Sequence, residues 1–302
     1  MNSTPKRSIL ITGCSPGGVR HSLALEFARQ GLHVFATARS TKQLVDLESK
    51  GIEVFPLDVT STESIAALKA EISKRTGGKL DMLFNNAGTM YEAPAIEADP
   101  VRVRQMYDTN VFGLFDMVTA FTPLLLASVA ESQVPPTIIN TSSILSRLPY
   151  PFSAAYNASK AAVSSYSDTL RIELAPLGIK VVTIFMGEVA TKLMFPDSIS
   201  FGQDSLYVDV EANVQKRSQE HAQKSMKPED FAQQIVHQVL SNPAIGKNEF
   251  VWKGTNSSTI SLLGSVGWRK IFDSTVESSA GLDKTEKKKA IFEKGQRRLR
   301  QE

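Results

Sequence analysis

The chain alternates short apolar runs with longer stretches that place apolar side chains three or four residues apart. The strand-like runs are Ile9–Thr12, His33–Ala36, Glu53–Leu57, Met82–Phe84, Thr137–Thr141, Lys180–Phe185 and Glu249–Trp252. Between the first two runs, Val19, Leu23 and Phe27 lie on one face of a helix. That helix is expected to close at Gly31. Strands joined by helices form a parallel sheet covered on both faces, so the pattern predicts a doubly wound α/β fold.

The same alternation sets the expected domain organisation. Further helical patterns cover Ile65–Lys74, about 155–174 and Pro228–Leu240, whereas the segment from Leu193 to Met226 is irregular. We expect a single domain without internal repeats. Its parts are a core over about 6–192, a substrate cap over about 193–226, and a C-terminal helix, strand and basic tail over 227–302.

The net charge is +3, but it is concentrated at the C-terminus. Residues 283–302 hold eight Lys or Arg and four Asp or Glu, so the rest of the chain is close to neutral. A nucleic-acid-binding fold would carry a basic surface on its body. We therefore expect no nucleic-acid partner. The tail is expected to be a solvated, disordered end, with weak contact to a membrane surface as the alternative.

One apolar stretch, Val111–Ala130, approaches the length of a membrane-spanning helix. Asp116, Thr122 and Ser128 interrupt it and favour a buried core helix. The chain enters its first strand without room for a signal peptide. Its single cysteine, Cys14, cannot form an intramolecular disulfide or the usual zinc site. These features predict an intracellular, cytoplasmic protein without a metal, and membrane or lipid-droplet association stays open.

A glycine-rich segment follows the first expected strand and opens the first helix. Glycines at such a turn let the backbone approach a pyrophosphate, and the helix N-terminus stabilises the negative charge. Because the segment lies in the first strand–helix–strand unit, it favours a dinucleotide site over a simple tight turn. The candidate binding residues are Gly13, Ser15, Gly17, Gly18, Val19 and Arg20.

The same segment also fits the Gly-x-Ser-x-Gly pattern of serine hydrolases, with Ser15 as the nucleophile. Such an enzyme needs a downstream histidine, for which only His221 and His237 are available. Neither follows an expected strand in a convincing loop. The dinucleotide site is therefore the favoured interpretation.

The end of the second strand indicates which dinucleotide would bind. A carboxylate there would bind the ribose 2′-hydroxyl of NADH, but the sequence has no acid and continues to Arg39. The guanidinium of Arg39 offers a rigid fork to a 2′-phosphate, which favours NADPH/NADP+. Asp58, at the end of the third strand, is placed to accept from the adenine amino group, with a turn or helix-capping role as the alternative.

Candidate site residues follow the fourth and fifth expected strands and continue into the next helices. They are Asn86, Ala87, Gly88, Asn110, Ser143, Tyr156 and Lys160. Tyr156 and Lys160 are four residues apart, one helical turn, so both lie on one face of a helix. Ser143 precedes Tyr156 by 13 residues, enough for a strand end to reach that helix.

Together these motifs resemble the short-chain dehydrogenase/reductase family over about residues 6–195. Within it, the Thr-Gly-Cys-Ser-Pro-Gly-Gly loop and the Phe250-Val251-Trp252-Lys253-Gly254 run are similar to the fungal NADPH-dependent acyl-dihydroxyacetone-phosphate reductase-like branch. The resemblance implies a Rossmann domain of three α/β/α layers. It also implies a homodimer or homotetramer formed through the helices that start near Asn110 and Ala155.

The resemblance further implies the roles of the site residues. Tyr156 would be the proton donor, Ser143 would polarise the substrate carbonyl, and Lys160 would bind the nicotinamide ribose. Asn110 would hold a water chain that reaches Lys160. A free tyrosine has a pKa of about 10, and a neighbouring ammonium lowers it toward a useful value. A neutral serine hydroxyl can stabilise a developing alkoxide without competing for the proton.

Two positions depart from the family pattern. Arg20 stands where related Gly-Gly-Ile-Gly sequences have their last glycine, so it would either loosen the loop or lie against the 2′-phosphate. Met186 replaces the proline of a Pro-Gly-x-Val-x-Thr motif, whose other positions are kept. Val189 and Thr191 would therefore still reach the nicotinamide carboxamide.

The residues after Thr191 suggest an apolar substrate, because the corresponding region of the family caps the active site. The apolar residues there are Leu193, Met194, Phe195, Phe201, Leu206 and Tyr207, and packing of the loop on its own core is the alternative. Trp252, Leu262, Leu263 and Trp268 would enlarge the apolar wall or touch a membrane. We expect NADPH-dependent reduction of an apolar ketone or aldehyde. Oxidation of a secondary alcohol and a non-redox NADP-binding scaffold are the alternatives.

Overall fold

A single parallel β-sheet organises the chain, which a computed structural model describes over residues 6–15, 17–190, 199–267 and 270–298. The strand order is β3-β2-β1-β4-β5-β6-β7, and every neighbouring pair is parallel. The strands are β1 Ser8–Ile11, β2 His33–Ala38, β3 Glu53–Pro56, β4 Met82–Asn85, β5 Thr137–Ser143, β6 Lys180–Met186 and β7 Phe250–Lys253. The doubly wound fold expected from the alternating pattern is confirmed, and the expected strands agree within two residues at nearly every end.

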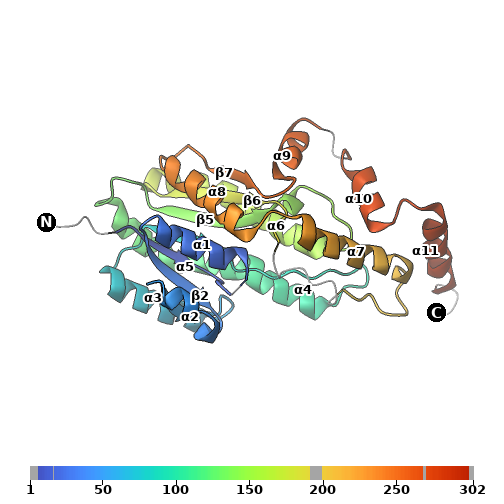
Figure 1. Cartoon of the computed structure of the whole chain (residues 1–302), viewed down its shortest axis with the longest axis horizontal. Helices are drawn as coiled ribbons and strands as arrows, with labels where there is room; N and C mark the ends of the chain where they lie inside the picture. The colour runs from blue at the N-terminus through green and yellow to red at the C-terminus, as the bar shows by residue number, and fades with distance from the viewer. Residues whose placement is uncertain (1–5, 16, 191–198, 268–269, 299–302) are drawn as a thin grey trace.

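Helices cover both faces of this sheet (Figure 1). The α-helices are α1 Val19–Arg29, α2 Val45–Glu48, α3 Thr62–Thr76, α4 Pro100–Tyr107, α5 Gly113–Val129, α6 Ala154–Leu174, α7 Val208–Lys224, α8 Pro228–Ser241, α9 Ser257–Val266, α10 Asp273–Ala280 and α11 Thr285–Arg298. Helices α1 and α8 pack with one face in a core around Phe27 and Ile235. Helices α3, α5 and α6 cover the other face in a core around Phe121 and Val163.

The stretch from Pro100 to Val129 passes the length and composition test for a membrane-spanning helix, but half of its most apolar window is buried in the protein. Met117, Phe121 and Leu125 of α5 belong to the core beneath the sheet. The prediction of a buried core helix is therefore confirmed. Its start differs from the expected one, because a π-helical turn over Asp108–Phe112 joins α4 to α5.

The prediction of an irregular segment from Leu193 to Met226 is wrong in the second half of that segment. Residues there form α7, a helix of 17 residues. Helix α7 is rich in charged and polar residues, so only a few apolar residues mark its buried face. Val210 and Val214 supply its buried contacts, beside Phe152 and Ala280.

The prediction of a disordered basic tail is also wrong over 285–298, which form α11. Lys287 of α11 donates to Asn213 Oδ1 at 2.5 Å, and Lys294 pairs with Asp209 at 2.6 Å. These contacts fix α11 on α7. Figure 1 shows α9, α10 and α11 extending beyond the sheet at the opposite end from the N-terminus.

Two glycines meet at the end of β6. Gly187 N donates to Lys253 O at 2.7 Å, and Glu188 and Thr255 exchange two backbone hydrogen bonds at 3.0 Å. A Cβ atom on Gly187 would lie 2.4 Å from Thr255 O and 2.9 Å from the carbonyl carbon of Gly254. Glycine at position 187 is therefore required for the close approach of the two chain segments that follow β6 and β7.

We predict that Gly187→Ala destabilises the fold by about 1–3 kcal/mol, because overpacked backbone must move apart. The matched control is Gly264→Ala in α9, where nothing lies within 4 Å of the added carbon. That change should be neutral or stabilise by up to about 1 kcal/mol through helix propensity. Urea unfolding measures both, and equal stability of Gly187→Ala and the wild type would contradict the packing argument.

Candidate active site

The site lies at the carboxyl ends of the strands, where the order reverses between β1 and β4. The Thr12 side chain connects the two loops that leave these strands. Its Oγ1 accepts from the backbone N–H groups of Asn86 and Ala87, both at 2.9 Å. The loop after β4 is thereby held against the glycine-rich loop after β1.

The glycine-rich loop needs its glycines for conformation and for space. Gly13 and Gly17 have φ values of 78° and 72°, which favour glycine. A Cβ on Gly13 would also lie 3.1 Å from Ala87 Cα. Gly18 is the N-cap of α1, and no side chain caps that end, so the helix N-terminus can receive an anion. Pro16 lies outside the described residues.

A cavity of about 550 Å³ opens beside this loop. It brings together residues expected to bind the dinucleotide, namely Gly13, Ser15, Arg20, Arg39, Asp58, Ala87 and Gly88. The Nδ2 atom of Asn86 is buried without a hydrogen-bond partner in the part of the chain that the structure describes. An open cavity with an uncapped helix end, exposed Arg39 and this orphaned amide fits a nicotinamide dinucleotide.

Asp58 has the turn role that was the alternative to a contact with the adenine amino group. Its Oδ1 accepts from Thr60 N at 2.9 Å and from Thr60 Oγ1 at 2.7 Å, and these bonds hold the pKa of the carboxyl below its usual value. The charge of Arg39 lowers that pKa further. Ser61, not Asp58, caps α3 by accepting from Ser64 N. Asp58 is therefore a turn residue that still lines the dinucleotide cavity.

Tyr156 and Lys160 lie buried on one face of α6, and Ser143 ends β5 beside them. Lys160 Nζ donates to Thr141 O at 2.9 Å and lies 5.8 Å from the centre of the Tyr156 ring. Burial raises the pKa of Tyr156 to about 12, while hydrogen bonding with Ser143 and the charge of Arg20 act in the opposite direction. Burial lowers the pKa of Lys160 to about 7, and the charge of Arg20 lowers it too.

Asn110 occupies the π-helical turn between α4 and α5, a local irregularity that is frequent at functional sites. Its Oδ1 accepts from Thr89 N at 2.8 Å, and its Nδ2 donates to Thr89 O at 2.9 Å. The same Nδ2 also donates to Ser159 Oγ at 3.2 Å. A Cβ on Gly88 would lie 3.2 Å from Asn110 Oδ1 and 3.7 Å from Lys160 Nζ. Asn110 and Lys160 therefore meet at Gly88.

A second, smaller cavity adjoins the Tyr156 and Ser143 side chains. Its walls are mostly apolar and come from Met90, Ile144, Leu145, Leu148, Met186 and Val189, with Tyr150, Glu188 and His221 as polar members. His221 is on α7, and sequence reasoning considered it only as a hydrolase partner. Neither His221 nor Tyr150 belongs to a motif in the sequence, so no sequence signal placed them at this cavity.

A buried ion pair anchors α7 above this cavity. Arg217 Nη2 lies 2.9 Å from Glu92 Oε1, with 9% and 5% of the two side chains exposed. The guanidinium of Arg217 also lies 3.9 Å from the centre of the Tyr150 ring. Tyr150 is thus positioned by Arg217 of α7.

Several expected cap residues are not at the cavity. Phe201 and Tyr207 pack against Phe152, at ring-centre distances of 4.9 and 5.6 Å, so the alternative of a cap packing on its own core describes them. Leu206 N donates to Glu97. Thr191, Leu193, Met194, Phe195 and Trp268 lie outside the described residues.

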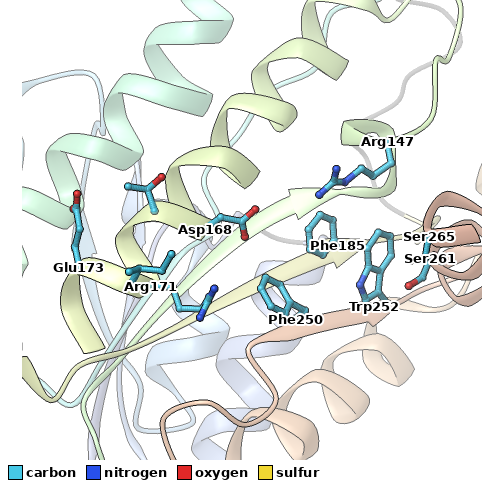
Figure 2. A pocket seen from close by; sticks show the side chains of 11 residues that line it. Arg147, Asp168, Arg171, Glu173, Phe185, Phe250, Trp252, Ser261 and Ser265 are labelled. Atoms are coloured by element: carbon cyan, nitrogen blue, oxygen red, sulfur yellow. The ribbon is translucent and has the colours of Figure 1, made fainter. Parts of the chain in front are cut away.

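Trp252 does not enlarge the wall of the Tyr156 cavity. It stacks on Phe185 at 4.1 Å and lines a separate surface cavity between α6, β7 and α9 (Figure 2). Figure 2 shows Arg147 and Arg171 on either side of the aromatic floor that Phe185, Phe250 and Trp252 form.

The hydrolase interpretation fails on geometry. His221 lies 3.9 Å from Glu188 beside the Tyr156 cavity, and His237 is exposed on α8. Ser15 lines the dinucleotide cavity instead.

Comparisons with known proteins agree with this geometry. The model of the short-chain dehydrogenase family matches residues 7–198. The short-chain dehydrogenase virD of Hypocrea virens is 38% identical over 269 residues, covering 87% of this chain and 89% of that protein. The NADPH-dependent 1-acyldihydroxyacetone phosphate reductase of Schizosaccharomyces pombe is 43% identical over 188 residues, 62% of each chain. The chain therefore belongs to the short-chain dehydrogenase family and is an oxidoreductase.

Solved structures support the same assignment. A short-chain dehydrogenase from Streptomyces avermitilis superposes with a TM-score of 0.73 at 26% identity, covering 93% of this chain and 100% of that one. The expected resemblance to the fungal acyl-dihydroxyacetone-phosphate reductase-like branch is confirmed by the fungal relatives.

We predict that Lys160→Met is more stable than the wild type at pH 7, by up to a few kcal/mol, since one pKa unit corresponds to about 1.4 kcal/mol. The fold lowers the pKa of this amine from 10.5 to about 7. Between those values the unfolded chain binds more protons, so the wild type gains stability as pH rises and the advantage of the variant shrinks.

Urea unfolding at pH 7 and about pH 10 tests this linkage. The exposed Lys74→Met on α3 is the control and should change stability little at either pH. An advantage of Lys160→Met that is the same at both pH values would contradict burial of the charge as its cause.

Proposed function

We propose that this enzyme uses NADPH to reduce the carbonyl of a largely apolar ketone or aldehyde. The observation that carries the proposal is the placement of the Tyr156 and Ser143 hydroxyls in the wall of one mostly apolar cavity. Lys160 lies behind Tyr156, and the dinucleotide cavity includes Gly88, which faces Lys160. The apolar wall supports a lipid-like or specialised-metabolite substrate.

The chain residues would divide the work at the carbonyl oxygen. Ser143 donates a hydrogen bond to that oxygen and stabilises the charge that develops on it. Tyr156 then transfers its proton to the same oxygen, completing the alcohol. The bound dinucleotide supplies the hydride. The raised pKa of Tyr156 keeps the phenol protonated near neutral pH, so the side chain carries the proton that the carbonyl oxygen would receive.

Lys160, Asn110 and the nicotinamide end of the site would have supporting roles. Lys160 binds the nicotinamide ribose and, when charged, lowers the pKa of Tyr156. Asn110 organises the Thr89 and Ser159 groups around Gly88, where a water chain would reach Lys160. Val189 would contact the nicotinamide carboxamide. In the alternative, oxidation of a secondary alcohol, the same steps would occur in reverse, with Tyr156 accepting the proton of the alcohol.

We predict that Tyr156→Phe lowers turnover by about 10²–10⁴-fold, the usual contribution of a positioned general acid. NADPH affinity should change little, because the lost hydroxyl faces the substrate cavity. A screen of apolar ketones that follows NADPH absorbance gives turnover, and titration calorimetry gives affinity.

The matched control for this variant is Tyr166→Phe, also on α6, whose ring stacks on Phe115 away from the site. It should retain wild-type turnover. Full activity of Tyr156→Phe would reject the mechanism, and a wild type that binds NADPH but reduces no ketone would favour the scaffold alternative.

The preference for NADPH would come from Arg39. It follows β2 without an acid nearby in the sequence and is exposed in the dinucleotide cavity. The NADPH-dependent relative from Schizosaccharomyces pombe supports the same preference.

We predict that Arg39→Asp weakens NADPH binding by about 10- to 100-fold, the value of hydrogen bonds to a charged group, and improves NADH binding. Arg102→Asp is the control, because Arg102 lines the same cavity but lies 3.9 Å over the Tyr91 ring. A preference that changes in Arg102→Asp and not in Arg39→Asp would assign the 2′-phosphate to Arg102.

Assembly and location remain proposals of the same kind. Exposed Phe112, Leu126 and Ile172 on and beside α5 and α6 support a homodimer or homotetramer through these helices, which sedimentation velocity measures. Exposed Leu262 and Val266 on α9 support weak membrane or lipid-droplet contact of a cytoplasmic enzyme, which vesicle flotation measures.

A further inference from the structure

Arg20 points into the centre of the site, along the glycine-rich loop. Its Nη2 donates to Gly88 O at 2.9 Å, and its Nη1 lies 3.5 Å from Gly13 O. Its Cδ would be 3.4 Å from a Cβ on Gly13. Arg20 therefore connects the loop after β1 to the loop after β4.

The guanidinium has neutral partners only. Both of its hydrogen bonds go to backbone carbonyls, and no carboxylate lies within ion-pair distance of it in the described part of the chain. The titratable groups that act on it are the Cys14 thiol and the Tyr156 phenol, both with raised pKa values. Burial lowers the pKa of Arg20 itself. A half-buried cation without an anion is unfavourable, so the site is built to accept negative charge.

A second cation faces the same point. Lys160 Nζ and Arg20 Nη2 would lie 3.7 and 3.8 Å from a Cβ on Gly88. The two groups therefore converge on Gly88, which belongs to the dinucleotide cavity together with Ser15 and Arg39. Arg39 follows β2, whereas Arg20 reaches the loop after β4.

A dinucleotide phosphate presents negative charge at two places, the 2′-phosphate and the pyrophosphate. The pyrophosphate is the one that lies at the loop between the first strand and first helix. We propose that Arg20 binds the pyrophosphate of the dinucleotide, which rests on the proposed function, and that it exchanges its bond to Gly88 O for bonds to phosphate oxygens. Arginine suits this role because its planar fork pairs with two phosphate oxygens.

The proposal separates the two arginines by what each one distinguishes. Arg20 would contribute equally to NADPH and NADH, since both carry the pyrophosphate. Arg39 would contribute to NADPH alone. The interpretation of Arg20 as a reader of the 2′-phosphate makes the opposite prediction for NADH.

The test measures binding to the nucleotide-free protein by titration calorimetry, without turnover. The probes are NADPH, NADH, ADP-ribose, which has the pyrophosphate without nicotinamide, and 2′-AMP, which has a 2′-phosphate without pyrophosphate. We expect Arg20→Gln to weaken the first three by a common factor of about 10–100 and to leave 2′-AMP unchanged. Added salt should weaken NADH binding less in the variant than in the wild type.

Three companion variants complete the design. Arg20→Lys keeps the charge without the fork and should recover part of the affinity. Arg20→Gly places the family glycine and should lose affinity like Arg20→Gln, so the two neutral variants support each other if one folds poorly. Arg104→Gln, at an exposed arginine of α4 outside this cavity, should leave NADH and ADP-ribose binding unchanged.

Two results would overturn the inference while leaving the proposed function intact. Loss of NADPH and 2′-AMP affinity with NADH unchanged would assign Arg20 to the 2′-phosphate. Unchanged or tighter binding of all probes by Arg20→Gln would make the bond to Gly88 a purely structural one. A wild type that binds no dinucleotide would instead overturn the proposed function, and the inference with it.

Discussion

The site depends on the hydroxyl of Thr12, which receives the backbone N–H groups of Asn86 and Ala87 at the point where the strand order reverses. Parallel strands end at the same edge of a sheet, but nothing in the strands themselves fixes the loops that leave them. This side chain holds the loop after β4 against the loop after β1, and the bond from Arg20 to Gly88 O adds a second connection. Gly88 is thereby placed where Arg20, Asn110 and Lys160 meet.

This arrangement places the positive charge of Arg20 close to the buried side chains of Tyr156 and Lys160. Burial raises the pKa of Tyr156 and lowers that of Lys160, so it favours the neutral form of both groups. The charge of Arg20 acts on both in the direction that makes Tyr156 more acidic and Lys160 less basic. An anion bound near Gly88 would offset that charge, which couples nucleotide binding to the protonation of Lys160.

The sequence predicted the parts of the fold whose signal is local. Apolar runs such as Ile9–Thr12 are typical of strands buried on both faces, and the four-residue spacing of Tyr156 and Lys160 puts both on one face of α6. Helix α7 was missed because its buried face consists of few residues, such as Val210 and Val214, among charged ones. The direction of the Arg20 side chain depends on Gly88, 68 residues away, and no local pattern contains that contact.

The contacts of Lys287 with Asn213 and of Lys294 with Asp209, which join α11 to α7, bear on how relatives of this enzyme can diverge. Helix α7 contributes His221 to the cavity beside Tyr156, and its Arg217 contacts Tyr150 in the wall of that cavity. Lys287 and Lys294 hold α7 from the end of the chain. Changes in the C-terminal helix can therefore shift the cap while the strands, the glycine loop and Tyr156 stay in place. Substitutions in α11 can therefore change the shape of the cavity beside Tyr156 without altering the residues that would act on the substrate.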